Sequence, residues 1–561
     1  MIAGSNAPGY LSNMKCSMYK AGYISVIGML FVLSCFGCKS QAEDDMLADE
    51  HVLSLPITDR KLVIAHCMTN ITRYKGHKFE DSCDPMYFSP SEPATAPLGG
   101  LTQVLPLADT FLVDKTLEEA VAFEMKAAIA SGIDGFQFYY TLNNDSWDDI
   151  IKAYFKVAEE KKLDFKFTFC ISHPSGGTED SRINGFGGRM KNILETVGRN
   201  NRHWLRTPDG RLVLYTWYGE GLADTTIDLK GRPSQYYMAR AYHKLEKVTG
   251  EKFACVVSIN EQISKEKLNV YLDYFPAVWI WTLPYTNDFI GNMVAEECRR
   301  RGRTFTGSAF SDFYTSKLLK KGTWDMFHSA KDAAAAGINA VERKYIVTGL
   351  SYNFRKQLEF SIKTEAPLIN IITWNDYPEG HHLAPEINHN DGFGLLLNYY
   401  KKLWLKESAP FQKDIVIVFY KKYNHNTQPR PFNIPVVEIE KRGIDIKVED
   451  SVEVVTILKE KGSITLNNQT REVLPGLQST RFAGLPGPVS VTLRRNDRVI
   501  ETVNSPEWIT SQPYRTDRIT YSFSNCTQDF YRDLFGTLPA VSFSEYNPGD
   551  PRNHIYYYNN K

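Results

Sequence analysis

The stretch that decides the fold is Leu368-Ile369-Asn370-Ile371-Ile372-Thr373-Trp374-Asn375-Asp376-Tyr377-Pro378-Glu379-Gly380-His381-His382. Its first part is a continuous apolar run of strand length, which is typical of a strand buried on both faces. Its second part turns abruptly polar, and Asp376 and Glu379 stand three residues apart in it. Polar residues just beyond the C-terminal end of a buried strand are how parallel α/β sheets and barrels present an active site. The simpler alternative is a buried strand that runs into a solvated acidic loop.

Similar apolar runs recur between residues 61 and 405 and alternate with segments of helical periodicity. One helix is expected from Leu117 to Ala128, opened by Asp114 and closed at Gly132, and another follows a Ser146 cap. Buried strands that alternate with helices predict an enlarged (β/α)8 TIM barrel, in the α/β class. A doubly wound open sheet is the alternative. The eight strand candidates are Lys61–Cys67, Ile133–Tyr140, Phe165–Ile171, Arg211–Tyr218, Phe253–Ile259, Pro276–Leu283, Thr304–Phe310 and Pro367–Trp374.

After Trp404 the pattern changes to short alternating or β-branched runs, separated by turns that contain Gly and Pro. Such a pattern predicts a small antiparallel β-sandwich. The expected strands are Asp414–Tyr420, Ile444–Val448, Val452–Ile457, Ser463–Leu466, Val489–Leu493 and Arg498–Val503. We divide the chain into a signal peptide (1–38), a tether (39–60), a catalytic barrel (61–405), an accessory sandwich (412–505) and a Tyr-rich extension (506–561) that wraps back onto one of the domains.

The N-terminal segment has the features of a secretion signal. Lys15 and Lys20 precede an apolar stretch that is too short to span a bilayer comfortably, and Gly37-Cys38 is followed by a polar, acidic segment. This resembles a bacterial lipoprotein signal with lipidation at Cys38; Cys35 and an ordinary cleaved signal are the alternatives. We therefore expect an extracytoplasmic protein, held at the outer membrane or cell surface by a lipid anchor only.

The overall charge excludes one class of partner. Lys plus Arg number 65 and Asp plus Glu number 65, so no net charge draws the chain to nucleic acid or anionic lipid. The cysteines after residue 39 have no spacing typical of a disulfide framework or a metal finger. We expect a monomer that uses no cofactor, binds no nucleic acid and acts on a polysaccharide or oligosaccharide.

Polar and aromatic residues gather where the predicted strands end, whereas lysine and arginine are scarce there. Amides, carboxylates and aromatic faces suit neutral sugar rings better than phosphates, which would require arginine clamps. His66 is either a core histidine or a partner for a sugar hydroxyl, and each tryptophan can equally serve packing. The residues expected to contact substrate are His66, Asn70, Tyr139, Tyr140, Trp217, Trp281, Trp374, Asn375 and His381.

The acids after the last strand could carry out glycoside hydrolysis. That reaction needs one carboxylic acid to protonate the leaving oxygen and one carboxylate to activate water or attack the anomeric carbon. Asp376 and Glu379 on one turn could lie roughly 6–9 Å apart, which would suit an inverting enzyme. We assign Glu379 as the general acid and Asp376 as the base. Asp145 is a third candidate acid, or else a helix cap before Ser146.

Three segments resemble glycoside hydrolase family 71, the endo-acting α-1,3-glucanases or mutanases. They are Lys61–Met68, Gly132–Asp145 and Trp374–Glu379, of which the last is similar to the family's Trp-Asn-Asp-Tyr-Gly-Glu signature. The resemblance implies an inverting hydrolase of α-1,3-glucan with Asp376, Glu379 and Asp145 as its acids. Two positions depart from the family pattern: Pro378 replaces the signature's Gly, and Cys67 replaces a usual Phe.

Two other functions remain open from the sequence. One is an endo-α-mannosidase-like hydrolase, because the last strand also resembles glycoside hydrolase family 99. The other is a glycan-binding surface lipoprotein without catalysis. A metal at His381-His382 with Glu379 is disfavoured, since adjacent histidines normally point apart and no His-Glu-x-x-His pattern exists.

Overall fold

The structure is a computed structural model of the 561-residue chain. It describes residues 57–77, 111–142, 147–224, 232–315, 317–327, 330–407, 411, 413–427, 436–439, 443–511, 518–542 and 555–557. The predicted lipidation site Cys38, its rival Cys35, the third acid Asp145, and most of the loop after the first strand lie outside the described residues. Those interpretations stay predictions.

The main sheet is a parallel barrel, as the sequence predicts. Its nine strands follow the order β7-β6-β5-β4-β3-β2-β1-β11-β8, and every pairing is parallel. β7 (Thr304–Phe305) and β8 (Gly307–Ala309) are consecutive pieces of one stretch at the two ends of that order, so the sheet closes on itself. The other strands are β1 (Leu62–Cys67), β2 (Gly135–Tyr140), β3 (Lys166–Ser172), β4 (Leu212–Trp217), β5 (Phe253–Ile259), β6 (Ala277–Ile280) and β11 (Leu368–Ile371).

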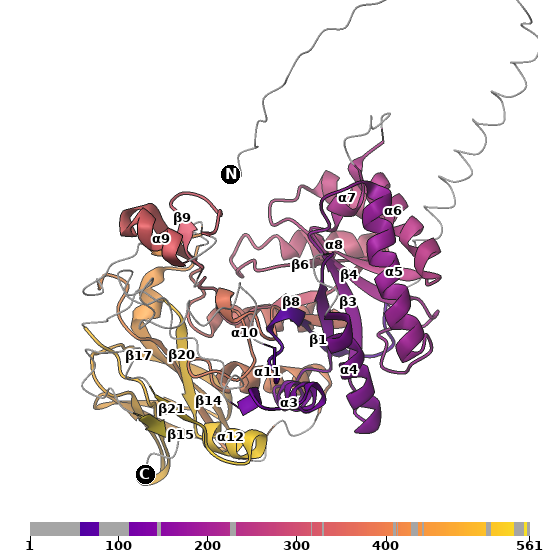
Figure 1. The fold of residues 1–561 in the computed structure, drawn as a ribbon. Coiled ribbons are helices and arrows are strands. Elements are labelled where there is room, and N and C mark those ends of the chain that lie inside the picture. The colour runs from indigo at the N-terminus through magenta and orange to yellow at the C-terminus, as the bar shows by residue number, and fades with distance from the viewer. Residues whose placement is uncertain are drawn as a thin grey trace, which may run out of the picture. The chain divides into compact units, whose positions relative to one another are not determined.

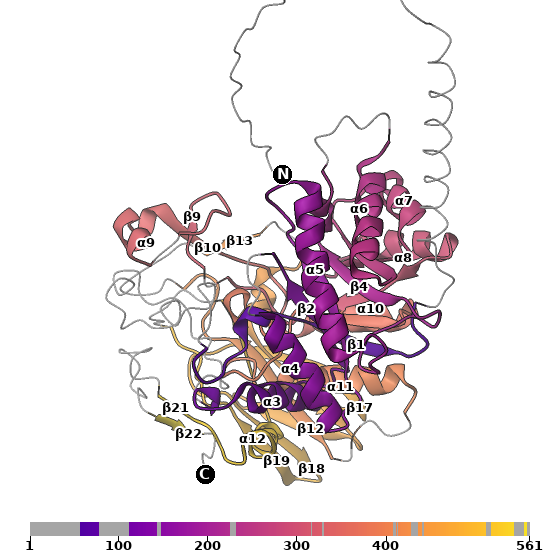
Figure 2. The ribbon, with the colours of Figure 1, turned by 45° about the vertical axis from the view of Figure 1, so that its right-hand side comes forward.

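Helices alternate with the strands and cover the outside of the barrel. Figures 1 and 2 show α4, α5 and α6 on the outer side of the strands. The first helix begins at a Thr116–Glu119 capping box, not at Asp114, because the Thr116 hydroxyl satisfies an otherwise free backbone N–H. The helices are α3 (Leu117–Ala130), α4 (Trp147–Glu160), α5 (Glu179–Val197), α6 (Ser234–Thr249), α7 (Lys265–Tyr274), α8 (Gly291–Arg300), α10 (Tyr352–Lys363) and α11 (Gly392–Trp404).

Alternation along each strand divides the barrel core into two layers. On β1, Leu62 and Ile64 belong to a cluster inside the barrel, whereas Val63, Ala65 and Cys67 belong to the cluster between strands and helices. His66 lies on the same side of β1 as Leu62 and Ile64, at the end of the strand. Every second side chain at a strand end, such as His66, therefore faces the mouth of the barrel.

Two antiparallel four-stranded sheets follow the barrel, in the orders β17-β14-β12-β20 and β16-β15-β18-β19. The segment Ile444–Val448 is not the strand expected, because Ile446–Asp450 forms a 3-10 helix capped by the Asp445 side chain. The C-terminal extension supplies β20, which pairs with β12. The strands are β12 (Ile415–Lys421), β14 (Ser451–Leu458), β15 (Gly462–Leu466), β16 (Gln469–Val473), β17 (Gly476–Ala483), β18 (Ser490–Arg495), β19 (Arg498–Asn504) and β20 (Thr520–Ser524).

Asp312, one of the polar residues after a barrel strand, serves the junction between the barrel and this sheet. It is fully buried and accepts hydrogen bonds from the backbone N–H of Thr520, at 2.6 Å, and from Lys421 Nζ, at 3.2 Å. Burial opposes its charge, but Lys421, His389 and Thr520 together outweigh that effect and hold the pKa of Asp312 well below its usual range. Asp312 is thus used to join the loop after β8 to β12 and β20.

Candidate active site

The turn after β11 brings three titratable side chains together. The 3-10 turn η7 (Tyr377–Glu379) ends at Gly380, whose φ of 69° and closeness to the Tyr314 carbonyl leave no room for a Cβ atom. One ligand-type atom from each of Asp376, Glu379 and His381 lies within 4.8 Å of the others. The sequence prediction that both acids stand at the C-terminal end of the barrel therefore agrees with the geometry.

Thr373, which the sequence analysis missed, fixes the shape of this turn. Its hydroxyl accepts a hydrogen bond from the Asp376 backbone N–H at 2.9 Å and lies 3.2 Å from Nδ1 of His381. Its own N–H donates to the carbonyl of His381 at 2.8 Å. The start and the end of the turn are thereby tied to one residue.

Asp376 is an acid in a buried environment. Only 6% of its surface is exposed. Burial, followed by the negative charge of Glu379, raises the pKa of Asp376 to about 6. Its nearest basic neighbour on the turn, Nε2 of His381, is 3.9 Å away. Asp376 therefore keeps its proton in mildly acidic solution, where an ordinary aspartate has lost it.

Glu379, in contrast to Asp376, is held in its ionised form. Lys317 Nζ donates to its Oε1 at 2.8 Å, and Nε2 of His381 lies 3.1 Å from its Oε2. Burial would raise the pKa of Glu379, but Lys317 and His381 outweigh burial and lower this pKa far below its usual range. Glu379 is therefore ionised next to a protonated Asp376.

The nearest oxygens of Asp376 and Glu379 lie within 4.8 Å of each other, and the separation of roughly 6–9 Å between their carboxyl groups stays a prediction. The expectation that basic residues are scarce at this end overlooked Lys317, which follows β8 and lies 62 positions before Glu379. A lysine in a loop has no sequence signal for where its amine reaches.

Aromatic side chains surround the same end of the barrel. The rings of Trp217 and Trp281 stack with centroids 4.6 Å apart, and His66 lies 5.0 Å from Trp281. The ring of Tyr139 is 5.9 Å from His66, and that of Trp281 is 6.1 Å from His381. Five of the residues expected to contact substrate are thus brought together beside the acids.

His66 and its neighbour on β2, Gln137, carry unused polar atoms. Both ring nitrogens of His66 and both amide atoms of Gln137 are buried without a hydrogen-bond partner. Burial lowers the pKa of His66 to about 3, so the imidazole is neutral. Buried polar groups without partners are rare and suit a ligand that brings its own hydroxyl groups.

Tyr140 and Trp374, which were also expected to contact substrate, are instead hydrogen-bonded within the core of the protein. The Tyr140 hydroxyl donates to Asp148 Oδ1 at 3.1 Å, and Trp374 Nε1 donates to Glu124 Oε2 at 2.6 Å. Both rings are fully buried in the layer between strands and helices. The cause is strand alternation, which turns Tyr140 away from the mouth when Tyr139 faces it.

Asn375 is likewise hydrogen-bonded within the protein. Its Oδ1 accepts from the Met68 N–H at 2.7 Å and its Nδ2 donates to the Met68 carbonyl at 3.1 Å, so the amide joins the turn to the chain after β1. Asn70, in the 3-10 turn η1 (Thr69–Ile71), is buried, and its contact with substrate stays a prediction.

The adjacent histidines face different carboxylates. His381 lies against Glu379, whereas Nε2 of His382 lies 3.4 Å from Glu386 Oε1. Among the described residues, two groups have the spacing that a metal ion needs: Asp376 with Glu379 and His381, and His382 with Glu386 and His389. The first group belongs to the candidate active site.

One comparison with protein families confirms the resemblance stated from the sequence. Residues 350–524 match the model of glycosyl hydrolase family 71. The matched segment contains Asp376 and Glu379 and extends through β20. This match supports a glycoside hydrolase that acts on a glycan. No curated protein matches the chain.

Several solved glycosidase structures are similar to the chain at low identity. The endo-alpha-mannosidase of family 99 from Bacteroides thetaiotaomicron has 10% identity and a TM-score of 0.41, over 62% of this chain and 99% of that chain. A family 2 glycosyl hydrolase from Bacteroides cellulosilyticus has 9% identity and a TM-score of 0.38, over 80% and 48%. The family 1 β-glucosidase from Thermotoga maritima has 11% identity and a TM-score of 0.31, over 62% and 99%. With TM-scores this low, the fold assignment rests on strand order and closure alone.

Proposed function

We propose that the chain hydrolyses internal α-1,3 linkages of an α-glucan such as mutan. The family match supports this proposal because it contains the turn with both acids. The likeness of the segments Lys61–Met68 and Gly132–Asp145 to the same family supports it further. The aromatic rings of Trp217 and Trp281 beside the acids offer apolar faces to sugar rings.

The observation that carries the proposal is the opposite displacement of two neighbouring pKa values. Acid and base roles in an active site follow from environments that separate the pKa values of a pair. Asp376 has the raised value and Glu379 the lowered one. We therefore reverse the roles expected from the sequence: Asp376 is the general acid, and Glu379 is the carboxylate that activates water or attacks the sugar.

In this mechanism Asp376 gives its proton to the glycosidic oxygen as the bond to the anomeric carbon breaks. The leaving sugar departs with a hydroxyl, and water supplies the new hydroxyl on the anomeric carbon. The carboxylate of Glu379 accepts the remaining proton, or first forms a bond to the sugar that water then cleaves. Lys317 and His381 keep Glu379 ionised until that step.

His66 and Gln137 would serve the binding of substrate. A neutral imidazole can both donate and accept, and an amide can do the same, so the pair can satisfy sugar hydroxyls. Lys317 is paired with Glu379, which makes it a poor anchor for an anionic ligand. These features favour an uncharged glycan over a phosphorylated one.

We also propose that the protein is a lipoprotein anchored through Cys38 at the outer membrane or cell surface. The support is the N-terminal sequence, with a short apolar stretch and a small residue before the cysteine. Within the described residues, no helix is long and apolar enough to cross a membrane. Mass spectrometry of the mature N-terminus would test the anchor, since lipid on any residue other than Cys38 contradicts it.

The experiment that tests the activity is incubation with insoluble α-1,3-glucan, dextran and α-mannan, with new reducing ends counted. We expect release from α-1,3-glucan alone, by the wild type but not by Asp376→Asn. Release from α-mannan alone would favour the endo-α-mannosidase-like hydrolase. Binding of a glycan without any release would favour the non-catalytic alternative.

A further inference from the structure

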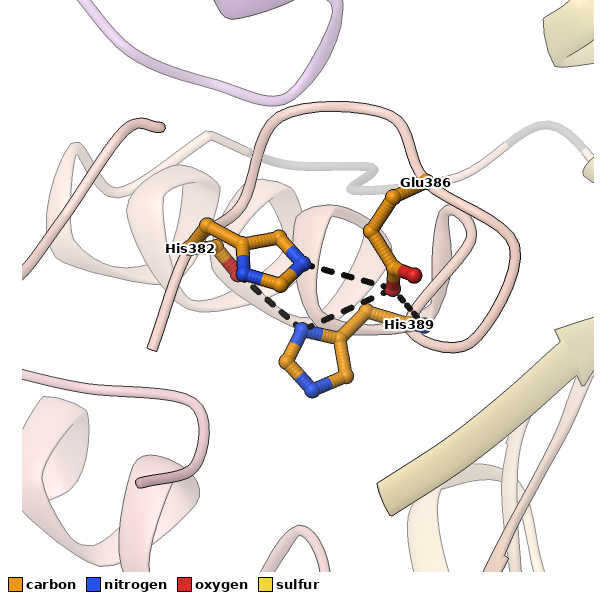
Figure 3. A group of neighbouring side chains, drawn as sticks. All are labelled: His382, Glu386 and His389. Carbon is orange, nitrogen blue, oxygen red and sulfur yellow. Dashed lines mark hydrogen bonds and ion pairs between the residues drawn. The ribbon is translucent and has the colours of Figure 1, made fainter. Parts of the chain in front are cut away.

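A second group of histidines and carboxylates lies directly after the candidate active site. Figure 3 shows the side chains of His382, Glu386 and His389 directed toward one another. Nε2 of His382 and Nδ1 of His389 lie 3.4 Å and 3.9 Å from the same oxygen, Oε1 of Glu386. The two imidazole rings stack with centroids 4.6 Å apart. The exposed fractions of the three residues are 0%, 0% and 1%.

Three of the four imidazole nitrogens in this cluster make no hydrogen bond, and the fourth, Nδ1 of His389, is hydrogen-bonded to the His382 carbonyl oxygen. Both ring nitrogens of His382 and Nε2 of His389 are buried without a hydrogen-bond partner. Such groups are rare in folded proteins and each requires an explanation, of which an ion is one. The carboxylate of Glu386 is held beside the two imidazoles by backbone N–H groups. The N–H of Asn388 donates to its Oε2, and the N–H of His389 donates to its Oε1.

One ring of the cluster, that of His389, has a carboxylate behind its second nitrogen, as metal-binding histidines commonly have. Asp312 Oδ2 lies 3.8 Å from Nε2 of His389, the nitrogen that points away from the cluster. A carboxylate behind the second nitrogen of a histidine is the usual outer partner of a metal ligand, because it orients the ring. Asp312 is itself fixed by Thr520 and Lys421.

We propose that His382, Glu386 and His389 bind one structural zinc ion. Two bonds of about 2.1 Å at a tetrahedral angle place two ligand atoms about 3.4 Å apart. The His382–Glu386 distance of 3.4 Å equals that value, and the His389–Glu386 distance of 3.9 Å is near it. Two imidazoles with one carboxylate suit zinc better than calcium or magnesium, which prefer oxygen.

The structure also offers a fourth ligand atom for the zinc ion and indicates a structural role for it. The carbonyl oxygen of His382 lies 3.1 Å from Nδ1 of His389 and belongs to the same cluster (Figure 3). The chain between His382 and Asp391 also binds the accessory sheet, because Asn390 Nδ2 donates to the Ser522 carbonyl at 2.7 Å. A zinc ion here would hold the segment that follows the acids against β20, without contacting the substrate.

The test uses the full mature chain, purified without a histidine tag and loaded with ZnCl2. We expect about one zinc per chain by inductively coupled plasma mass spectrometry after gel filtration. Stripping with a chelator should lower the unfolding midpoint by about 5 °C, and ZnCl2 but not CaCl2 should restore it. Glu386→Gln and His389→Gln should lose the zinc, whereas the matched control His425→Gln, in the accessory domain, should keep it.

Three results would overturn the proposal: wild type that retains no zinc, a midpoint that neither chelator nor ZnCl2 changes, or equal zinc in wild type and Glu386→Gln. The first two need no variant, so they decide the matter even if the variants do not fold. Failure here leaves the hydrolase proposal intact, because glycan cleavage is measured separately and relies on other residues.

Discussion

Lys317 Nζ and Glu379 Oε1 lie 2.8 Å apart, although 62 positions separate the two residues in the chain. The pair connects the loop after β8 to the turn after β11 at the end of the barrel. The charge of Lys317 favours the ionised form of Glu379, whereas burial and the negative charge of Glu379 keep the proton on Asp376. The acid–base chemistry proposed here depends on that difference between the two acids.

Replacement of Lys317 by Met should move the acidic limb of the pH–activity profile upward. Without the ammonium group the pKa of Glu379 rises, because an opposite charge at this distance lowers such a pKa by about 1–3 units. Glu379 would then be protonated in mildly acidic solution and lose its function there. The measurement is kcat/KM against pH. The control is Lys321→Met, an exposed lysine of the same loop, and an acidic limb equal in the two variants would refute the role of Lys317.

Asp376→Asn should make the protein more stable at pH 8 while it abolishes hydrolysis. The folded protein raises the pKa of Asp376 to about 6, above the value near 3.9 of an unfolded chain. A raised pKa favours folding only while the group is protonated, so this contribution is lost as the pH rises from about 4 through 6. The neutral amide avoids that loss. At pH 8, urea unfolding should give the variant a free energy of unfolding about 1–3 kcal/mol above that of wild type. At pH 4 the free energies of unfolding of the variant and of wild type should be similar.

A stability gain that is equal at both pH values would show that the effect is not electrostatic. A variant that is less stable than wild type at pH 8 would contradict the raised pKa and buried environment of Asp376.

Two tryptophans with different surroundings should respond differently to substitution. Trp281→Ala removes a ring beside the acids and should raise KM about 2–10-fold with little change in the unfolding midpoint. Trp374→Phe leaves the buried carboxyl of Glu124 without its donor and should cost about 1–3 kcal/mol of stability, with KM unchanged. Oligosaccharide kinetics and thermal unfolding measure the two effects. Equal changes in KM would mean that the ring of Trp374 also serves substrate.

The stereochemistry of the first product tests the spacing of the acids. The family resemblance implies inversion, for which carboxyl groups stand about 6.5–9.5 Å apart, whereas about 5–5.5 Å is typical of retention. The nearest oxygens of Asp376 and Glu379 lie within 4.8 Å, which predicts retention if these two residues form the pair. Proton NMR at early times identifies the anomer released. Inversion would require a second acid other than Glu379.

Much of the fold could be predicted because its signals are local. Each barrel strand is a short apolar run, and the acids follow the last one directly, so their place at the strand ends is contained in a few consecutive residues. It was harder to predict which of two adjacent residues at a strand end faces the mouth of the barrel. Tyr139 and Tyr140 are adjacent and alike, and only the pairing in the barrel decides which one faces the mouth.

The remaining errors concern contacts between distant segments. Asn375 binds the backbone at Met68, Trp374 binds Glu124, and Lys317 binds Glu379. None of these pairs has a spacing that a sequence pattern can reveal. The reversal of the acid and base roles that we propose has the same origin, because the pKa of each carboxyl depends on burial and on a lysine from another loop.

The most direct test of the account is the pH dependence of kcat/KM for hydrolysis of α-1,3-glucan by the wild type, Asp376→Asn and Glu379→Gln. We expect wild-type activity to fall as the pH rises through about 6, where Asp376 loses its proton. We also expect each variant to keep its fold and to lose about 10²–10⁴-fold or more in rate. Activity that increases from pH 6 to pH 8, or normal turnover by either variant, would contradict the proposed mechanism.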